Sequence, residues 1–181
     1  MIFLFLQGKN LYILFRLVET FAMPDIRKRP LDKLDISILR TLQKDGRISY
    51  VDLADKVGLS STPCIERVRR LEKEGYIEGY HARLNPELLG YNMLVFVEIS
   101  LSYQSPDSFK KFSDAVETLP YILECHLVSG DSDYLIKARI RGISEYRALL
   151  GDMLLTLPGV KNSKSYIVME ELKESLSLPL D

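Results

Sequence analysis

The sequence has only two cysteines, Cys64 and Cys125, and two histidines, His81 and His126. So few cysteines exclude a disulfide-dense secreted fold, and with no visible secretion signal they indicate a reducing cytoplasm. The same scarcity argues against a zinc site built on cysteine and histidine. The sequence also lacks a nucleophile elbow, a phosphate-binding loop and a metal-binding motif, so it predicts neither an enzyme nor a cofactor.

Neither sign of charge is in large excess, because 24 Lys and Arg stand against 25 Asp and Glu in 181 residues. Hydrophobic residues make up 46%, which is typical of a soluble globular protein rather than a disordered one. The charge is unevenly distributed: residues 23–86 carry a net +3, whereas residues 87–181 carry −5. A mildly basic first half beside an acidic second half predicts two modules with different partners.

Residues 1–22 contain many large apolar side chains, but no uninterrupted apolar run that is long enough to cross a membrane. Lys9, Arg16 and Glu19 break the run. We therefore expect this extension to lie outside the native fold and translation to start at Met23, which opens a polar, proline-bearing stretch. The alternative is an amphipathic helix lying at a membrane surface.

Three short amphipathic helices are predicted between residues 31 and 75. The first runs through LDKLDISILRTLQKDG, with Asp32 as its N-cap and Asp35 three residues later. The second runs through SYVDLADKVG, where Ser49 can cap the first turn and Gly58 can adopt the left-handed stop. The third runs through STPCIERVRRLEKEG.

Only Gly58-Leu59-Ser60 separates the second predicted helix from the third, and this spacing indicates a helix-turn-helix motif. Ser61 or Thr62 is the expected cap of the third helix, whose polar side chains are expected to be exposed. In such motifs this helix enters the major groove of DNA, and arginines bind phosphates or guanine edges. The predicted DNA-contacting residues are Arg47, Ser60, Ser61, Thr62, Pro63, Glu66, Arg67, Arg69, Arg70 and Lys73.

The run YIEGYHARLN at residues 76–85 has a strand-like pattern and could form a small wing after the third helix. A simpler interpretation of the whole region stays open, because many three-helix units only pack together and a basic stripe is often a solvated face. The net charge of +3 is modest, so we expect weak non-specific affinity for DNA at physiological salt.

Residues 91–170 alternate strand and helix patterns in the order β-α-β-β-α-β, the split unit of ferredoxin-like folds. The fold class is therefore α+β. In such a fold two helices cover one face of the sheet and leave the other uncovered. Both alternating sets of the first strand are apolar, with Val95, Val97 and Ile99 on one side and Leu94 and Phe96 on the other, so the uncovered face is a candidate dimer interface. The expected strands are 93–101, 122–129, 134–140 and 160–169, and the expected helices are 106–119 and 144–157.

Several runs together resemble the Lrp/AsnC family, over nearly all of residues 29–175, and the first 22 residues have no counterpart in it. These runs are LQKDGRIS (42–49), VGLSSTPCIERVRRLEKEGYI (57–77), LVFVEI (94–99), ECHLVSGDSDYLIK (124–137) and LLTLPGV (154–160).

The resemblance implies a feast/famine transcription regulator that binds double-stranded DNA and acts in the cytoplasm on the nucleoid. It implies a winged helix-turn-helix domain over 23–86, a ferredoxin-like RAM domain over 87–174 and a tail over 175–181. It further implies a homodimer that assembles into an octamer or a similar ring, and an amino-acid effector bound between subunits. Leucine is the expected effector, while methionine or another apolar amino acid is compatible.

The candidate effector site is the turn between the second and third strands of this domain. Asp131 and Asp133 can hold an ammonium group, and the turn amides around Gly130 can hold a carboxylate. An ordinary polar hairpin turn would have the same residues, but the family's G-D-x-D stretch matches this one. The predicted effector-binding residues are Leu127, Ser129, Gly130, Asp131, Ser132, Asp133, Tyr134 and, on the last strand, Tyr166.

Two functions follow from these patterns. The first is a DNA-binding regulator of amino-acid metabolism whose assembly or DNA binding responds to an amino acid. The alternative is an architectural protein that bends DNA with little response to a ligand. Cys64, Cys125 and His126 are expected to have structural roles, since adjacent residues of a strand point to opposite faces and cannot jointly hold a metal.

Overall fold

A computed structural model describes residues 29–180, except for the side chains of residues 152–155. The expected extension at residues 1–22 and the expected start at Met23 lie outside the described residues. Within them, Asn85–Leu172 form one unit, and the residues up to Leu84 join Lys173 and its successors in the other. No helix of the described part is long and apolar enough to span a membrane.

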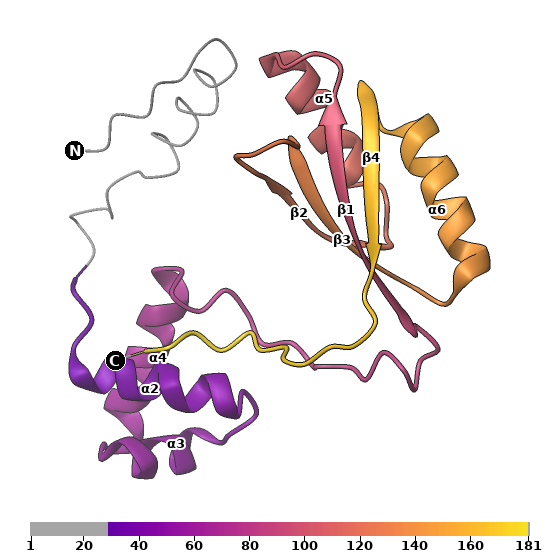
Figure 1. Cartoon of the computed structure of the whole chain (residues 1–181). Coiled ribbons are helices and arrows are strands. Elements are labelled where there is room, and N and C mark those ends of the chain that lie inside the picture. The colour runs from indigo at the N-terminus through magenta and orange to yellow at the C-terminus, as the bar shows by residue number, and fades with distance from the viewer. Residues whose placement is uncertain (1–28, 181) are drawn as a thin grey trace. The chain divides into compact units, whose positions relative to one another are not determined.

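The helical unit begins at the N-cap that the sequence predicts, Asp32, and the structure adds a reciprocal capping box with Asp35. Asp32 accepts a hydrogen bond from the backbone N–H of Asp35, and the Asp35 side chain accepts one from the backbone N–H of Asp32. Gly58 ends the second helix in the left-handed conformation, with φ of 72°. The three helices are α2 (Lys33–Lys44), α3 (Tyr50–Val57) and α4 (Ser61–Lys73) (Figure 1).

A small apolar core holds these three helices together. Leu53 of α3 and Val68 and Leu71 of α4 pack with Ile38 of α2, and each of them is almost completely buried. Cys64 lies in the same core, where burial raises the pKa of its thiol. It therefore packs as a small apolar group, as the sequence suggests.

Two local predictions for this unit are wrong. The N-cap of α4 is Ser60 rather than Ser61 or Thr62, and its side chain makes no capping hydrogen bond. Residues 76–85 contain no strand in the part of the chain that is described. Instead the backbone N–H groups of Tyr76 and Ile77 both donate to the carbonyl of Leu71, which closes the end of α4 without a partner strand.

The second unit is the four-stranded antiparallel sheet with two helices that the pattern predicts. The strand order is β2-β3-β1-β4, and each neighbouring pair is antiparallel. The elements are β1 (Met93–Leu101), α5 (Pro106–Val116), β2 (Ile122–Leu127), β3 (Tyr134–Ile140), α6 (Ile143–Thr156) and β4 (Val160–Ile167). The order β-α-β-β-α-β is that of a ferredoxin-like fold.

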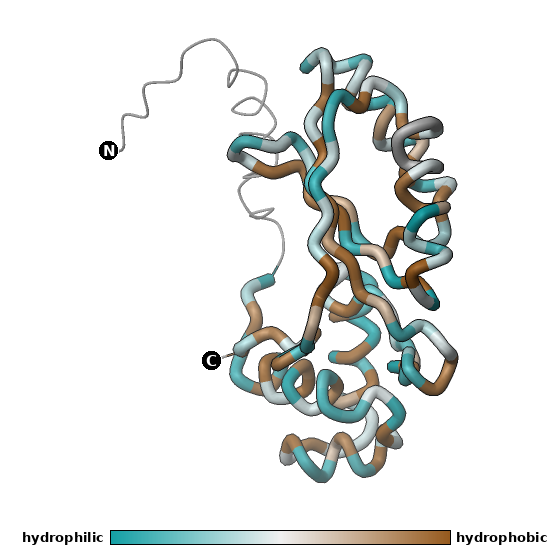
Figure 2. The backbone as a smooth tube through the Cα atoms, turned by 45° about the vertical axis from the view of Figure 1, so that its right-hand side comes forward, coloured by the Kyte–Doolittle hydropathy of each residue, from teal (hydrophilic) through white to brown (hydrophobic). Residues whose placement is uncertain are grey.

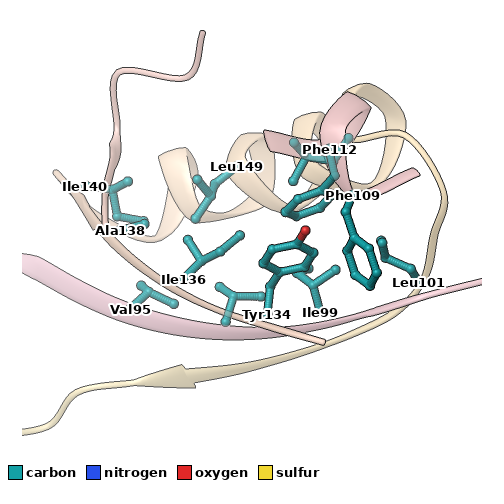
Figure 3. Packing of buried hydrophobic residues seen from close by; sticks show 12 residues of the cluster. Val95, Ile99, Leu101, Phe109, Phe112, Tyr134, Ile136, Ala138, Ile140 and Leu149 are labelled. Carbon is teal, nitrogen blue, oxygen red and sulfur yellow. The ribbon is translucent and has the colours of Figure 1, made fainter. Parts of the chain in front are cut away.

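Both helices pack against the same face of this sheet. Val97 of β1 and Ile136 of β3 are fully buried beneath Phe112 of α5 and Leu149 of α6. The ring of Tyr134 stacks on Phe112, with 4.2 Å between ring centroids (Figure 3). Figure 2 shows hydrophobic and hydrophilic residues mixed along the strands as well as along the helices, and the buried residues of β3 alternate with half-buried ones. The first strand therefore gives one alternating set of side chains to the core and the other to the open face.

The open face carries a polar network beside apolar residues. Tyr166 of β4 donates a hydrogen bond from its hydroxyl to Glu98 of β1, at 3.1 Å. Glu124 of β2 pairs with Lys137 of β3 at 2.9 Å and with His126 at 3.2 Å. The ion pair with Lys137 contributes most to keeping the pKa of Glu124 below its usual value.

Candidate DNA-binding helix and effector turn

The N-terminus of α4 is open toward solvent. Ser60, Ser61 and Thr62 are exposed, and no side chain caps the first turn. A helix leaves its first N–H groups without partners inside the helix, and these groups favour a negative group such as a phosphate. Pro63, which has no N–H, sits in the first turn without disturbing this arrangement.

One face of α4 is exposed along its whole length. Thr62, Glu66, Arg69 and Lys73 follow one another at intervals of four, three and four residues, and all four are exposed. Arg47, in the turn before α3, is exposed as well. This face presents hydroxyl, carboxylate, guanidinium and ammonium groups, which can contact phosphates and base edges.

Arg67 and Arg70 point the other way, toward α2. The Nη1 atom of Arg67 lies 2.7 Å from the Oδ2 atom of Asp32 and 2.8 Å from the Oδ1 atom of Asp35. The Nη2 atom of Arg70 lies 2.5 Å from the other carboxylate oxygen of Asp35. The two arginines thus hold α4 against α2.

Asp35 is the centre of this network and is completely buried. Burial alone would raise the pKa of its carboxyl, but the backbone N–H of Asp32 and the guanidinium groups of Arg70 and Arg67 together hold that pKa below its usual value. The backbone N–H of Asp35 and the side chain of Arg67 lower the pKa of Asp32 to about 2. A buried carboxylate of this kind needs its cations, since removing one partner leaves an uncompensated charge.

The expectation that all polar side chains of α4 are exposed is therefore wrong for Arg67 and Arg70. Both are half-buried and engaged with carboxylates of the same domain. Sequence reasoning treated Asp35 only as a capping residue. The sequence did contain a signal for this buried, paired role. Asp35 lies in the apolar stripe of the first helix, four residues after Leu31 and three before Ile38, and a carboxylate buried in such a stripe needs a cationic partner.

The predicted effector turn joins β2 to β3. Ser129, Gly130 and Asp131 are exposed, and Ser132 is half-buried. The backbone N–H of Val128 donates to the carbonyl of Asp133 at 2.9 Å and closes the turn. The exposed residues thus form a projection that carries one exposed carboxyl group, that of Asp131.

Asp133 differs from Asp131, because it is 5% exposed and its carboxylate is used inside the domain. Its Oδ2 atom accepts a hydrogen bond from the backbone N–H of Leu101 at 2.7 Å, and its Oδ1 atom accepts one from the side-chain amide of Gln104 at 2.6 Å. Asp133 therefore anchors the turn to the end of β1. Sequence reasoning missed Gln104, for which no local pattern gave a signal.

The remaining predicted effector residues lie on two different faces of the sheet. Leu127 and Tyr134 pair across β2 and β3 and, together with Phe109 of α5, line a cavity of about 720 Å³. Tyr166 lies on the opposite, open face, where it pairs with Phe96. Within one subunit the structure does not bring Tyr166 and the turn together. Among the described residues there is no cluster of three metal-ligating side chains.

A helix-turn-helix with an exposed polar reading face, followed in the chain by a ferredoxin-like sheet, defines a class of DNA-binding regulators. Residues 31–78 match the winged helix-turn-helix DNA-binding family, and residues 94–178 match the Lrp/AsnC ligand binding domain. The leucine-responsive regulatory proteins of Klebsiella pneumoniae and Escherichia coli K12 are each 58% identical over 156 residues, covering 84% of this chain and 95% of theirs.

Solved structures have the same fold. A transcriptional regulator of Neisseria meningitidis, in complex with L-methionine, is 35% identical with a TM-score of 0.79, covering 84% of this chain and 98% of its own. A feast or famine regulatory protein of Mycobacterium tuberculosis, also complexed with L-methionine, is 30% identical with a TM-score of 0.75, covering 82% and 99%. This chain belongs to the Lrp/AsnC family. It is a DNA-binding transcription regulator and not an enzyme.

Proposed function

We propose that the chain binds double-stranded DNA through the exposed face of α4 and that an apolar amino acid modulates this binding. The open N-terminus of α4, with Ser60 making no capping bond, is the observation that carries the DNA contact. The contacts come from Arg47, Ser60, Ser61, Thr62, Pro63, Glu66, Arg69 and Lys73. Arg67 and Arg70 act indirectly, by holding this helix against α2.

The effector is an amino acid, and leucine is the first candidate. Relatives that are 58% identical carry the name leucine-responsive, and two regulators of similar fold are complexed with L-methionine. The exposed carboxylate of Asp131 suits an ammonium group, and the amides around Gly130 and Ser132 suit a carboxylate. The buried carboxylate of Asp133 holds this turn in place.

A second subunit completes the site in this proposal. Leu127 and Tyr134 face the helix side of the sheet, whereas Tyr166 lies on the open face, so a ligand that touches all of them needs two copies of the chain. The half-buried Phe96 on the open face supports a homodimer through this surface, and dimers assemble into an octamer or a similar ring. The protein then acts in the cytoplasm, on nucleoid DNA.

The test is the melting temperature of the protein against each of the twenty amino acids, followed by DNA binding with any that shift it. A ligand at about 100 times its dissociation constant adds roughly 2.7 kcal/mol to the free energy of unfolding if it binds only the folded form. A shift with leucine, methionine or a similar side chain supports the proposal. A flat panel together with tight DNA binding favours the architectural, DNA-bending alternative.

A further inference from the structure

One acidic side chain lies in the middle of the face that α4 presents to solvent. Glu66 is exposed, four residues after Thr62 and three before Arg69, and both of these are exposed as well. The buried residues of the helix, Cys64 and Val68 among them, lie on its opposite side. Glu66 therefore projects from the same stripe as the side chains that are proposed to contact DNA.

The arginines nearest to Glu66 on the helix do not neutralise its carboxylate. A helical glutamate commonly pairs with a cation four residues later, which here is Arg70. The guanidinium of Arg70 is instead held 2.5 Å from the buried Asp35, and that of Arg67 lies 2.7 Å from Asp32. Among the described residues, the side chain of Glu66 has neither a hydrogen bond nor an ion pair. Its charge is thus available to an outside donor.

A free carboxylate on this face opposes contact with the DNA backbone. Phosphates attract the cations of Arg69 and Lys73, but they repel the like charge of Glu66. The parts of the duplex that attract a carboxylate are donors on the base edges. In the major groove these donors are the amino groups of cytosine and adenine. Glu66 therefore distinguishes between base pairs, which a phosphate-binding cation does not do.

Of the four bases, cytosine suits a carboxylate best. Cytosine presents its N4 amino group, whereas adenine places the acceptor N7 beside its N6 amino group. Guanine presents only the acceptors N7 and O6, and thymine presents the acceptor O4 and a methyl group. Because an ionised carboxylate can only accept hydrogen bonds, Glu66 favours cytosine over adenine and disfavours guanine and thymine.

We propose that Glu66 determines base specificity by accepting a hydrogen bond from the N4 amino group of one cytosine in each half-site of the bound DNA. Glu66 is the sixth residue of α4, which begins at Ser61. It belongs to the N-terminal part from which the second helix of a helix-turn-helix reaches base edges. This assignment rests on the proposed function, because it requires the exposed face of α4 to enter the major groove.

The experiment replaces the acceptor by a group with a different base preference. The full-length wild type, Glu66→Gln, Glu66→Ala and Glu78→Gln each select duplexes from a random library, and the bound duplexes are sequenced. Glu78→Gln is the matched control, because Glu78 is also exposed and lies beyond the C-terminal end of α4. Melting temperatures check that all variants are folded.

The variants should differ at a single position of the half-site. The wild type and Glu78→Gln should select cytosine there, and Glu66→Gln should select adenine, which glutamine recognises through N6 and N7. Glu66→Ala should select no base at this position. Thymine in place of the cytosine should weaken wild-type binding about ten-fold, a usual cost of one mismatched pair, and leave the binding of Glu66→Ala nearly unchanged.

The outcomes separate the base assignment from the proposed function. If both Glu66 variants keep the wild-type preference at every position, the assignment is overturned and sequence-specific DNA binding still stands. If these variants bind all duplexes more tightly and select the same sequence, Glu66 only repels phosphates, and the assignment is again overturned. If the wild type enriches no sequence at all, the proposed DNA-binding function and the base assignment are overturned together.

Discussion

Arg70 of α4 lies against Asp35 of α2, with 2.5 Å between its Nη2 atom and the Oδ2 atom of the carboxylate. Asp35 is completely buried, and Arg67 contacts its other oxygen at 2.8 Å. Two of the arginines on α4 therefore orient the helix, whereas Arg69 is left on the exposed face. This division of roles among three neighbouring arginines leads to opposite expectations for their substitution.

Arg70→Ala should destabilise the helical domain, because it leaves part of a buried carboxylate without its cation. Removing one partner of a buried pair costs about 3–5 kcal/mol, and the partial exposure of Arg70 places the expected loss near the lower end. Urea denaturation measures this loss. Arg69→Ala is the matched control, and an equal loss of stability in both variants would contradict the assignment.

Arg69→Ala should weaken DNA binding and reduce its dependence on salt. A lost phosphate contact lowers the slope of log affinity against log salt by about one. Fluorescence anisotropy with a duplex selected from a random library, at two or more salt concentrations, measures the slope. An unchanged slope and affinity would remove Arg69 from the interface.

The helical domain should lose stability as the pH falls from about 4 to 2. The pKa of Asp32 is about 2 in the folded chain against a usual value of 3.8, and the pKa of Asp35 is lowered too. A lowered folded-state pKa means that the unfolded chain binds protons more readily, so the stabilisation is complete above the usual value and disappears as the pH falls through the folded value. Denaturation of Asp32→Asn at several pH values should show a flatter acid limb than the wild type, and equal limbs would count against the pKa assignment.

Substitutions at Asp133 and Asp131 should have different effects, the first on folding stability and the second on amino-acid binding. The Asp133 carboxylate accepts hydrogen bonds from the Leu101 N–H and the Gln104 side chain. In Asp133→Asn an NH2 group takes the place of one accepting oxygen and faces one of these donors. We expect this substitution to cost about 1–3 kcal/mol of folding stability. Asp131→Asn should leave stability unchanged and weaken amino-acid binding. Calorimetric titration and thermal melting of both variants measure the two effects. Full leucine affinity in Asp131→Asn would move the ammonium site elsewhere.

The open face of the sheet should be the dimer interface. Phe96→Glu places a charge in the centre of this face and should release monomers in sedimentation experiments. Lys111→Glu, on the exposed side of α5, introduces the same residue away from the sheet and should leave the assembly intact. A dimer that survives Phe96→Glu would place the interface on another surface.

Much of the fold was predictable because local sequence patterns specify it. The N-cap at Asp32, the left-handed Gly58 and the bounds of β1 and β3 follow from spacing and residue type alone. The strand expected over residues 76–85 does not form, because a strand needs a partner and no segment among residues 29–180 pairs with this one.

The site was less predictable, because its key contacts join residues far apart in the sequence. The Asp35–Arg70 pair spans 35 positions, and the Asp133–Gln104 bond spans 29. The placement of Tyr166 on the face opposite Tyr134 depends on strand register, which a list of motif residues does not contain. Leu180 packs against the helical core, but it lies in a tail without regular secondary structure. No local pattern therefore predicts this contact.

The most direct test is the affinity of the full-length chain for its selected duplex, measured by anisotropy with and without saturating L-leucine. The account predicts a change of about five-fold or more in the dissociation constant, lost in Asp131→Asn and retained in Lys111→Glu. An affinity that is identical with and without leucine, and likewise with methionine, would contradict amino-acid control of DNA binding.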